Sequence, residues 1–228
     1  MDIYVFRAWI TSAGEVIQAN RDHLTQLDAA IGDADHGINL ARGFAAVAEV
    51  IPGATSPGGL LATVGSTLIS KVGGASGPLY GVAFRRAGKS LGAMPDVDLP
   101  ALGAALEAAL AGVQQLGAAR EGDKTMVDAL APATRAFAVA VADGASQAQA
   151  LSALASAAAT GATATIDMQA RKGRASYLGP RSVGHEDPGA ASTALILAAL
   201  RDSALGDTAR RGTALGDAVG DTALGDGG

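Results

Sequence analysis

The sequence contains no cysteine, few aromatic residues and no long apolar run. Without thiols the chain can form no disulfide, no thiolate nucleophile and no cysteine-ligated zinc site. No stretch approaches the ~18 uncharged apolar residues that a membrane-spanning helix requires. Residues 1–10 also lack the basic region and apolar run of a secretory signal. We therefore expect a cytoplasmic protein that does not enter a membrane.

Positive charge is also scarce. The 228 residues include 17 Lys and Arg against 22 Asp and Glu, which gives a net charge of −5. This balance argues against nucleic acid or an anionic membrane surface as the main partner. A protein of this charge that handles phosphates must use local devices, such as metal ions, helix ends and a few arginines.

Alanine is abundant, and its distribution predicts an all-α protein. Alanine is the best helix former, whereas aromatic residues, which strands prefer along with β-branched ones, make up only 4% of the chain. The apolar spacing indicates helices over eight segments, from which we expect an eight-helix antiparallel up-and-down bundle or barrel: 3–30, 36–50, 58–71, 76–92, 98–118, 123–142, 146–170 and 188–205.

The last part of the chain differs in composition from the rest. The tetrapeptide Ala-Leu-Gly-Asp occurs at 204–207, 214–217 and 223–226. Glycine and aspartate are too frequent there to favour a long helix. The sequence therefore predicts one domain over 1–206, whose last helix ends near Gly206, and a flexible low-complexity tail over 207–228.

Three aspartates, Asp28, Asp33 and Asp35, lie within eight positions. Asp33 and Asp35 are two residues apart, so their side chains point the same way if the loop is extended. Clustered carboxylates repel one another unless a cation joins them, and oxygen ligands favour Mg²⁺ or Ca²⁺. The alternative is that Asp33 or Asp35 only caps the following helix.

Three further loops carry unusual residues. Gly73–Gly77 precedes a predicted helix, where backbone N–H groups can bind a phosphate, although an ordinary turn has the same composition. In the loop at 122–128, Asp123 is placed to cap a helix, while Thr125 and Met126 can line a nucleotide pocket. The stretch 171–189 gathers cations that suit phosphate oxygens, or that simply form a solvated basic loop.

Together these motifs resemble the L subunit of dihydroxyacetone kinases. The matching stretches, GDADHGINLARGF, VGGASGPLYG, EGDKTMVDALAP and MQARKGRASYLGPRSVGHEDPGA, occur in the order found in that family over about 20–200. The resemblance implies a barrel of eight antiparallel helices that binds ADP or ATP at one end. It also implies that Asp28, Asp33 and Asp35 hold two Mg²⁺ ions against the nucleotide phosphates.

The same resemblance implies roles for further residues. Arg174 is the expected catalytic residue, because it helps to stabilise charge during phosphoryl transfer. The residues expected to bind or enclose the nucleotide are His36, Gly37, Asn39, Ala75, Ser76, Gly117, Thr125, Met126, Arg174, Asp187 and Gly189.

The implied activity is phosphotransfer to dihydroxyacetone. In this family the ketone is held covalently on a separate K-type subunit, which a chain of this length has no room to include. An M-type phosphocarrier subunit, charged from phosphoenolpyruvate, is expected to rephosphorylate the bound ADP. Two alternatives stay open: the same kinase subunit with exchangeable ATP, and a non-catalytic nucleotide-sensing module that controls a regulator.

Overall fold

The computed structural model describes the backbone of residues 1–221 and the side chains of residues 1–207. Over this part of the chain every regular element is helical and no strand occurs. Short 3₁₀ segments cover Ile51–Gly53, Thr165–Asp167 and Arg174–Ser182. The α-helices are α1 (Ile3–Ala19), α2 (Arg21–Ile31), α3 (His36–Val50), α4 (Pro57–Lys71), α5 (Ser76–Leu91), α6 (Leu99–Gly117), α7 (Val127–Ala142), α8 (Gln147–Ala164) and α9 (Pro188–Asp221).

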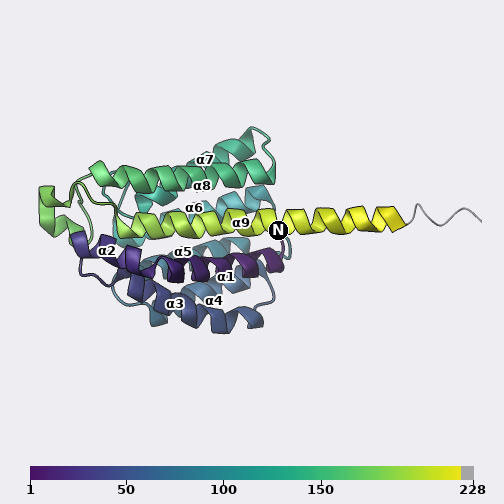
Figure 1. Ribbon diagram of the computed structural model, residues 1–228, viewed down its shortest axis with the longest axis horizontal. Coiled ribbons are helices and arrows are strands. Elements are labelled where there is room, and N and C mark those ends of the chain that lie inside the picture. Colours follow the sequence, from purple (N-terminus) through teal and green to yellow (C-terminus); the bar gives the residue numbers. More distant parts are fainter. Residues whose placement is uncertain (222–228) are drawn as a thin grey trace, which may run out of the picture.

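Eight of these helices close into a ring. Following the packing from neighbour to neighbour, the order is α1, α3, α4, α5, α6, α7, α8 and α9, and α9 packs on α1 again. The long helices run along a common axis, while α2 and the segment between α8 and α9 lie at one end (Figure 1). The predicted eight-helix barrel is therefore confirmed, with α2 as an additional short helix at that end.

Some helix boundaries differ from the sequence prediction. The predicted helix over 3–30 is two helices, because the chain breaks at Asn20, whose side-chain amide donates to the carbonyl of Val16. Asparagine competes with helical hydrogen bonds in this way, and the break lets α2 turn across the end of the barrel. The helices predicted over 123–142 and 146–170 were too long, because α7 begins at Val127 and α8 ends at Ala164.

Helix α9 is longer than the sequence indicated. It continues past Gly206 to Asp221 and projects from the bundle at the end opposite α2 (Figure 1). The alanines, leucines and arginines between its glycines are strong helix formers, so they favour continuation. The division into a domain over 1–206 and a tail stays a prediction, and 222–228 lie outside the described residues. Within the described chain no helix is apolar and long enough to cross a membrane.

The core of the ring is apolar and is linked across the chain ends by one tryptophan. Trp9 on α1 packs edge-on against Phe6, with ring centroids 5.8 Å apart, and lies 5.9 Å from the ring of Phe84 on α5. Its indole N–H donates to the carbonyl of Ile196 on α9 at 2.9 Å. Burial of the aromatic rings, with the indole N–H satisfied, therefore joins the first and last helices of the ring.

Helices α4 and α5 approach so closely that their facing backbones are nearly in contact. A Cβ built on Gly88 would lie 2.6 Å from the carbonyl oxygen of Gly58 and 2.7 Å from the amide nitrogen of Ala62. Both neighbours are backbone atoms, so neither can move aside without shifting a helix. Because Ser76 is the first residue of α5, this close packing also determines the position of the N-terminal end of α5.

We predict that Gly88→Ala destabilises the fold by about 1–3 kcal/mol, because the added methyl group forces α4 and α5 apart. Gly103→Ala on α6 is the matched control, since its Cβ would lie 3.6 Å from the ring of Phe137, an ordinary contact. That variant should gain up to about 1 kcal/mol from helix propensity. Urea unfolding measures both. Equal changes in the two variants would contradict the close packing described for Gly88.

Candidate functional site

The three aspartates lie together at the end of the barrel. Asp28 is on the last turn of α2, and Asp33 and Asp35 are in the short connection to α3. One carboxylate oxygen from each lies within 4.8 Å of those of the other two. Asp28 is buried, Asp35 is half-buried and Asp33 is exposed. The sequence prediction that these residues gather is therefore confirmed.

Asp28 fixes the turn that carries the other two aspartates. Its Oδ2 accepts hydrogen bonds from the backbone N–H groups of Asp35, at 2.8 Å, and His36, at 3.1 Å. These donors belong to the N-terminus of α3, whose partial positive charge favours a carboxylate. Ala34 adopts a left-handed φ of +62°, which turns the chain between Asp33 and Asp35. The side chain of Asp35 makes no capping bond, so the capping alternative does not account for it.

This donor set fits a hard divalent cation. Three carboxylates, with no nitrogen or sulfur donor among them, form the kind of oxygen-ligand site that Mg²⁺ prefers. Across the opening, Arg174 Nη2 lies 3.0 Å from Asp33 Oδ2. A single exposed guanidinium offsets only part of the negative charge, so the cluster retains an electrostatic demand for a cation.

The glycine-rich loop lies beside the acidic cluster. Gly74 adopts a left-handed φ of +65°, and a Cβ added there would lie 3.9 Å from the carboxylate of Asp35. Helix α5 begins at Ser76, whose hydroxyl hydrogen-bonds with His36 Nδ1 at 2.9 Å. Ala75 and Ser76 line the cavity. The loop therefore places a helix N-terminus next to three carboxylates. This arrangement suits a phosphate that the helix N-terminus binds and that a cation bridges to the carboxylates.

A buried chain of hydroxyl groups continues from His36 into α9. His36 Nε2 hydrogen-bonds with Ser192 Oγ at 2.8 Å, and Ser192 Oγ hydrogen-bonds with the Tyr80 hydroxyl at 2.7 Å. Burial lowers the pKa of His36 despite the nearby carboxylates of Asp28 and Asp35, and raises the pKa of Tyr80 to about 12. Both groups are thus favoured in their neutral forms, and the chain fixes α3, α5 and α9 around the pocket.

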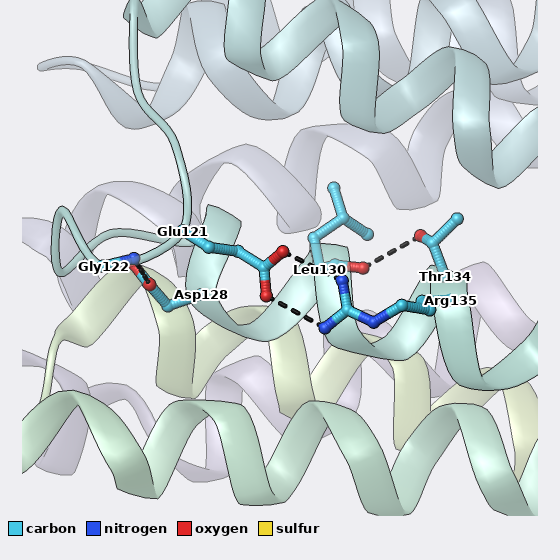
Figure 2. Close-up of polar contacts among 6 residues, drawn as sticks. All are labelled: Glu121, Gly122, Asp128, Leu130, Thr134 and Arg135. Carbon is cyan, nitrogen blue, oxygen red and sulfur yellow. Dashed lines mark hydrogen bonds and ion pairs between the residues drawn. The ribbon is translucent and has the colours of Figure 1, made fainter.

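The turn between α6 and α7 forms another wall. Asp128 accepts the N–H groups of Gly122, at 2.5 Å, and Thr125, at 2.8 Å. Figure 2 shows the bond to Gly122 and the two-point ion pair between the exposed side chains of Glu121 and Arg135. Asp128, rather than the expected Asp123, therefore organises the start of α7. With the turn fixed, Thr125 and the buried Met126 line the cavity.

The segment from 165 to 187 closes the remaining side. Arg174 lines the cavity there, and so does Asp187, whose Oδ2 accepts the N–H of Ala190 at 2.7 Å at the start of α9. Burial raises the pKa of Asp187 to about 7, and the nearby Asp128 carboxylate adds to the increase. A Cβ on Gly189 would lie 3.0 Å from Asp187 Oδ2, which leaves little room for a larger residue.

Three residues expected at the nucleotide do not line this cavity. Gly37 lies at the contact of α3 with α2, where a Cβ would overlap the carbonyl of Arg21. Asn39 is buried, and its Oδ1 accepts a hydrogen bond from Arg42. Gly117 ends α6 beside Leu79. The other predicted residues line the cavity: Asp28, Asp33, Asp35, His36, Ala75, Ser76, Thr125, Met126, Arg174, Asp187 and Gly189.

Three polar residues of the cavity wall are missing from the predicted site: Tyr80, Lys124 and Lys172. Tyr80 follows the glycine-rich loop by one helical turn, and that spacing is a signal that was available. Lys124, in contrast, is fully buried in a turn that reads as solvent-exposed, and no pattern in the sequence marks it.

Comparisons with known proteins show which family the chain resembles. The family model described as the DAK2 domain matches residues 30–202. The ADP-binding subunit DhaL of the phosphoenolpyruvate-dependent dihydroxyacetone kinase of Escherichia coli is 43% identical over 191 residues, which cover 83% of this chain and 91% of that subunit. The ADP-binding subunit DhaL of dihydroxyacetone kinase 1 from Listeria innocua is 41% identical over 196 residues, covering 84% and 92%.

A solved structure shares the fold. The crystal structure of the dihydroxyacetone kinase of C. freundii superposes with a TM-score of 0.67 and 29% identity over 87% of this chain. This chain spans only about a third of that one (34%). The same enzyme in complex with AMP-PNP and Mg²⁺ gives a TM-score of 0.65. On the family model and the identities with two DhaL subunits, the chain belongs to the DAK2 domain family of dihydroxyacetone kinase subunits.

Proposed function

We propose that this chain is the ADP-binding phosphotransfer subunit of a dihydroxyacetone kinase. The observation that carries the proposal is the convergence of three carboxylates, a glycine-rich helix N-terminus and an arginine on one cavity. Catalysis of phosphoryl transfer consists mainly of positioning the groups and neutralising charge, and these are the parts that it needs. The similar DhaL subunits are named for ADP binding, which agrees with that reading.

Each wall of the cavity has a separate task in this proposal. Asp28, Asp33 and Asp35 hold Mg²⁺, whose chemistry when bound is to offset phosphate charge. Ser76 and the backbone N–H groups of the glycine-rich loop orient phosphate oxygens. Arg174, 3.0 Å from Asp33, is the cation nearest the acidic cluster and stabilises charge on the transferring group.

The base of the nucleotide takes the opposite wall. Thr125 and Met126 offer a hydroxyl and an apolar surface there, and Gly117 keeps the adjacent end of α6 free of a side chain. Asp187 and Gly189 close the pocket at the start of α9. Gly37 and Asn39 act indirectly, since they pack α3 against α2 and against the glycine-rich loop at Gly73.

The ketone and the phosphate donor are assigned to partner subunits. We propose a K-type subunit that holds dihydroxyacetone and an M-type phosphocarrier that rephosphorylates the bound ADP. Two facts support this division. Several similar subunits are named as phosphoenolpyruvate-dependent or phosphotransferase-system-dependent, and the C. freundii kinase chain is about three times as long as the part that this chain matches.

We predict that native mass spectrometry of the purified chain detects bound ADP. We also expect the chain to transfer phosphoryl groups when it is mixed with its K-type and M-type partners. Asp33→Asn should lose most of the Mg²⁺-dependent nucleotide retention and slow transfer at least about 10²-fold, with helicity unchanged. Asp22→Asn, the same change at an exposed position of α2, is the control. Nucleotide that exchanges freely would favour the ATP-using kinase. Bound nucleotide with no transfer in any mixture would contradict a catalytic role.

We predict that Arg174→Ala slows phosphoryl transfer by about 10²-fold and shifts the melting temperature by less than about 2 °C. The reason is that the Arg174 side chain is 66% exposed and its ion pair with Asp33 contributes little to folding. Arg181→Ala, an exposed arginine in the same segment that does not line the cavity, should leave both quantities unchanged. A large loss of stability in Arg174→Ala with normal transfer would assign this arginine to the fold.

The buried Asp187 predicts a pH-dependent stability for the nucleotide-free protein. Its folded pKa of about 7 exceeds the ordinary aspartate pKa of 3.8, so the folded state binds the proton more tightly than the unfolded state. This contribution is complete below pH 3.8 and disappears as pH rises through 7. Between pH 5 and pH 8 the wild-type chain should lose about 2–3 kcal/mol from this group.

Asp187→Asn should remove this component, because asparagine cannot ionise but can still accept the N–H of Ala190. Urea unfolding at pH 5 and pH 8, in the presence of a chelator, gives the change in unfolding free energy for both proteins. Titrating groups that do not interact with Asp187 cancel in the comparison. Identical pH dependence in the two proteins would show that Asp187 is ionised throughout this range.

A further inference from the structure

Lys124 is buried at a point where three elements meet. It lies in the turn between α6 and α7, has a left-handed φ of +61°, and is only 1% exposed. Its Nζ donates to four backbone carbonyl oxygens, which belong to Thr165 at 2.8 Å, Met168 at 3.1 Å, Ser182 at 2.7 Å and His185 at 2.5 Å.

These bonds occupy the whole ammonium group. An ammonium has three N–H donors, and four carbonyl oxygens share them. A buried charge is tolerated only when it is hydrogen-bonded in this way. Although Lys124 lines the cavity, no donor is left over for a phosphate oxygen, which distinguishes it from the exposed Arg174.

The four carbonyls lie at the two ends of one excursion of the chain. The excursion covers residues 165–185, with Thr165 and Met168 near its start and Ser182 and His185 near its end. Arg174 lies between these two pairs. Lys124 therefore ties the two ends of the excursion to each other and to the turn before α7. A backbone bond from Arg171 N to the Asp123 carbonyl, at 3.0 Å, joins the same two segments.

Two further hydrogen bonds join the ends of the excursion, from Gly184 N to the Ile166 carbonyl at 2.8 Å and from Asp187 N to Thr165 Oγ1 at 2.9 Å, but few contacts hold it to the helices of the ring. Its apolar contacts form a small cluster of its own, in which Ala170, Ala175 and the half-buried Leu178 pack around Ile31 of α2. Burying two alanines contributes far less than burying the large side chains of the main core. The ion pair of Arg174 with Asp33 is exposed and contributes at most about 1 kcal/mol.

We propose that Lys124 is a positioning residue that closes the base of the 165–185 excursion and thereby holds Arg174 over the acidic cluster. This inference rests on the proposed function only for its effect on phosphoryl transfer. Without the ammonium, four carbonyls lose their donor and the excursion opens locally. The three aspartates are held by α2 and α3, so metal-dependent nucleotide retention persists.

A double-mutant cycle tests whether Lys124 acts through Arg174. We expect Lys124→Met to slow transfer to about the same extent as Arg174→Ala, and the double variant to be no slower than Arg174→Ala by more than about twofold. Lys89→Met, which removes an exposed lysine of α5, should have no effect. Losses that multiply in the double variant would overturn the proposal.

Amide hydrogen exchange provides a measurement that does not depend on activity. In Lys124→Met the amides of 166–186 should exchange at least about tenfold faster, while those of α4 and α5 keep their protection. If the wild-type chain transfers nothing, the proposed function fails, yet the exchange result still decides the role of Lys124. Loss of protection throughout the barrel would make Lys124 a determinant of the whole fold and overturn the proposal.

Chemical rescue separates the ammonium from the size of the side chain. The chain has no cysteine, so Lys124→Cys can be aminoethylated at a single site in the unfolded state and refolded. The product carries an ammonium on a side chain of nearly the length of lysine. We expect it to regain slow exchange over 166–186 and most of the transfer rate. Failure to regain either, in a refolded and helical product, would overturn the proposal.

Discussion

The site depends on one buried carboxylate, that of Asp28. Its Oδ2 accepts the N–H groups of Asp35 and His36, so it satisfies the start of α3 and fixes the turn that carries Asp33 and Asp35. A carboxylate stripped of water is costly unless it is hydrogen-bonded, and here the N-terminus of a helix supplies the donors. These two hydrogen bonds thus offset the free-energy cost of burying Asp28. They also bring the carboxylates of Asp33 and Asp35 within 4.8 Å of it. Folding therefore assembles a cluster of negative charge that a divalent cation complements.

The closed ring of helices brings sequence-distant segments to that cluster. His36 is the clearest case, because its two ring nitrogens bond to Ser76 of α5 and Ser192 of α9. One imidazole thus sets the spacing of three helices that begin at the same end of the barrel. Those helix starts can converge only if the helices pack at fixed distances, and the backbone contact at Gly88 in α5 meets this requirement.

The sequence predicted much of this and missed what depends on tertiary contacts. The helices and the acidic cluster were predictable, because alanine content and close aspartate spacing are local signals. The break at Asn20 and the extension of α9 past Gly206 were not predictable, since each depends on a small difference in helix stability among a few residues. Asp123 has the usual appearance of a cap, yet its side chain accepts the N–H of Arg120. The N–H groups of Gly122 and Thr125 are accepted by Asp128 instead. The role of Lys124 was invisible, because its partners are carbonyls about forty or more positions away.

The two halves of the site differ in how firmly the fold holds them. The acidic half belongs to α2 and α3, which are bound to the ring by the main core. The cationic half lies on an excursion whose small apolar cluster is separate from that core. Polar contacts must therefore hold the excursion, and exposed ion pairs are too weak for that task. A buried ammonium shared among four carbonyls is stronger, because losing it leaves several buried acceptors unpaired. Retention of a nucleotide and transfer of its phosphoryl group can then respond separately to substitutions, since they depend on different halves.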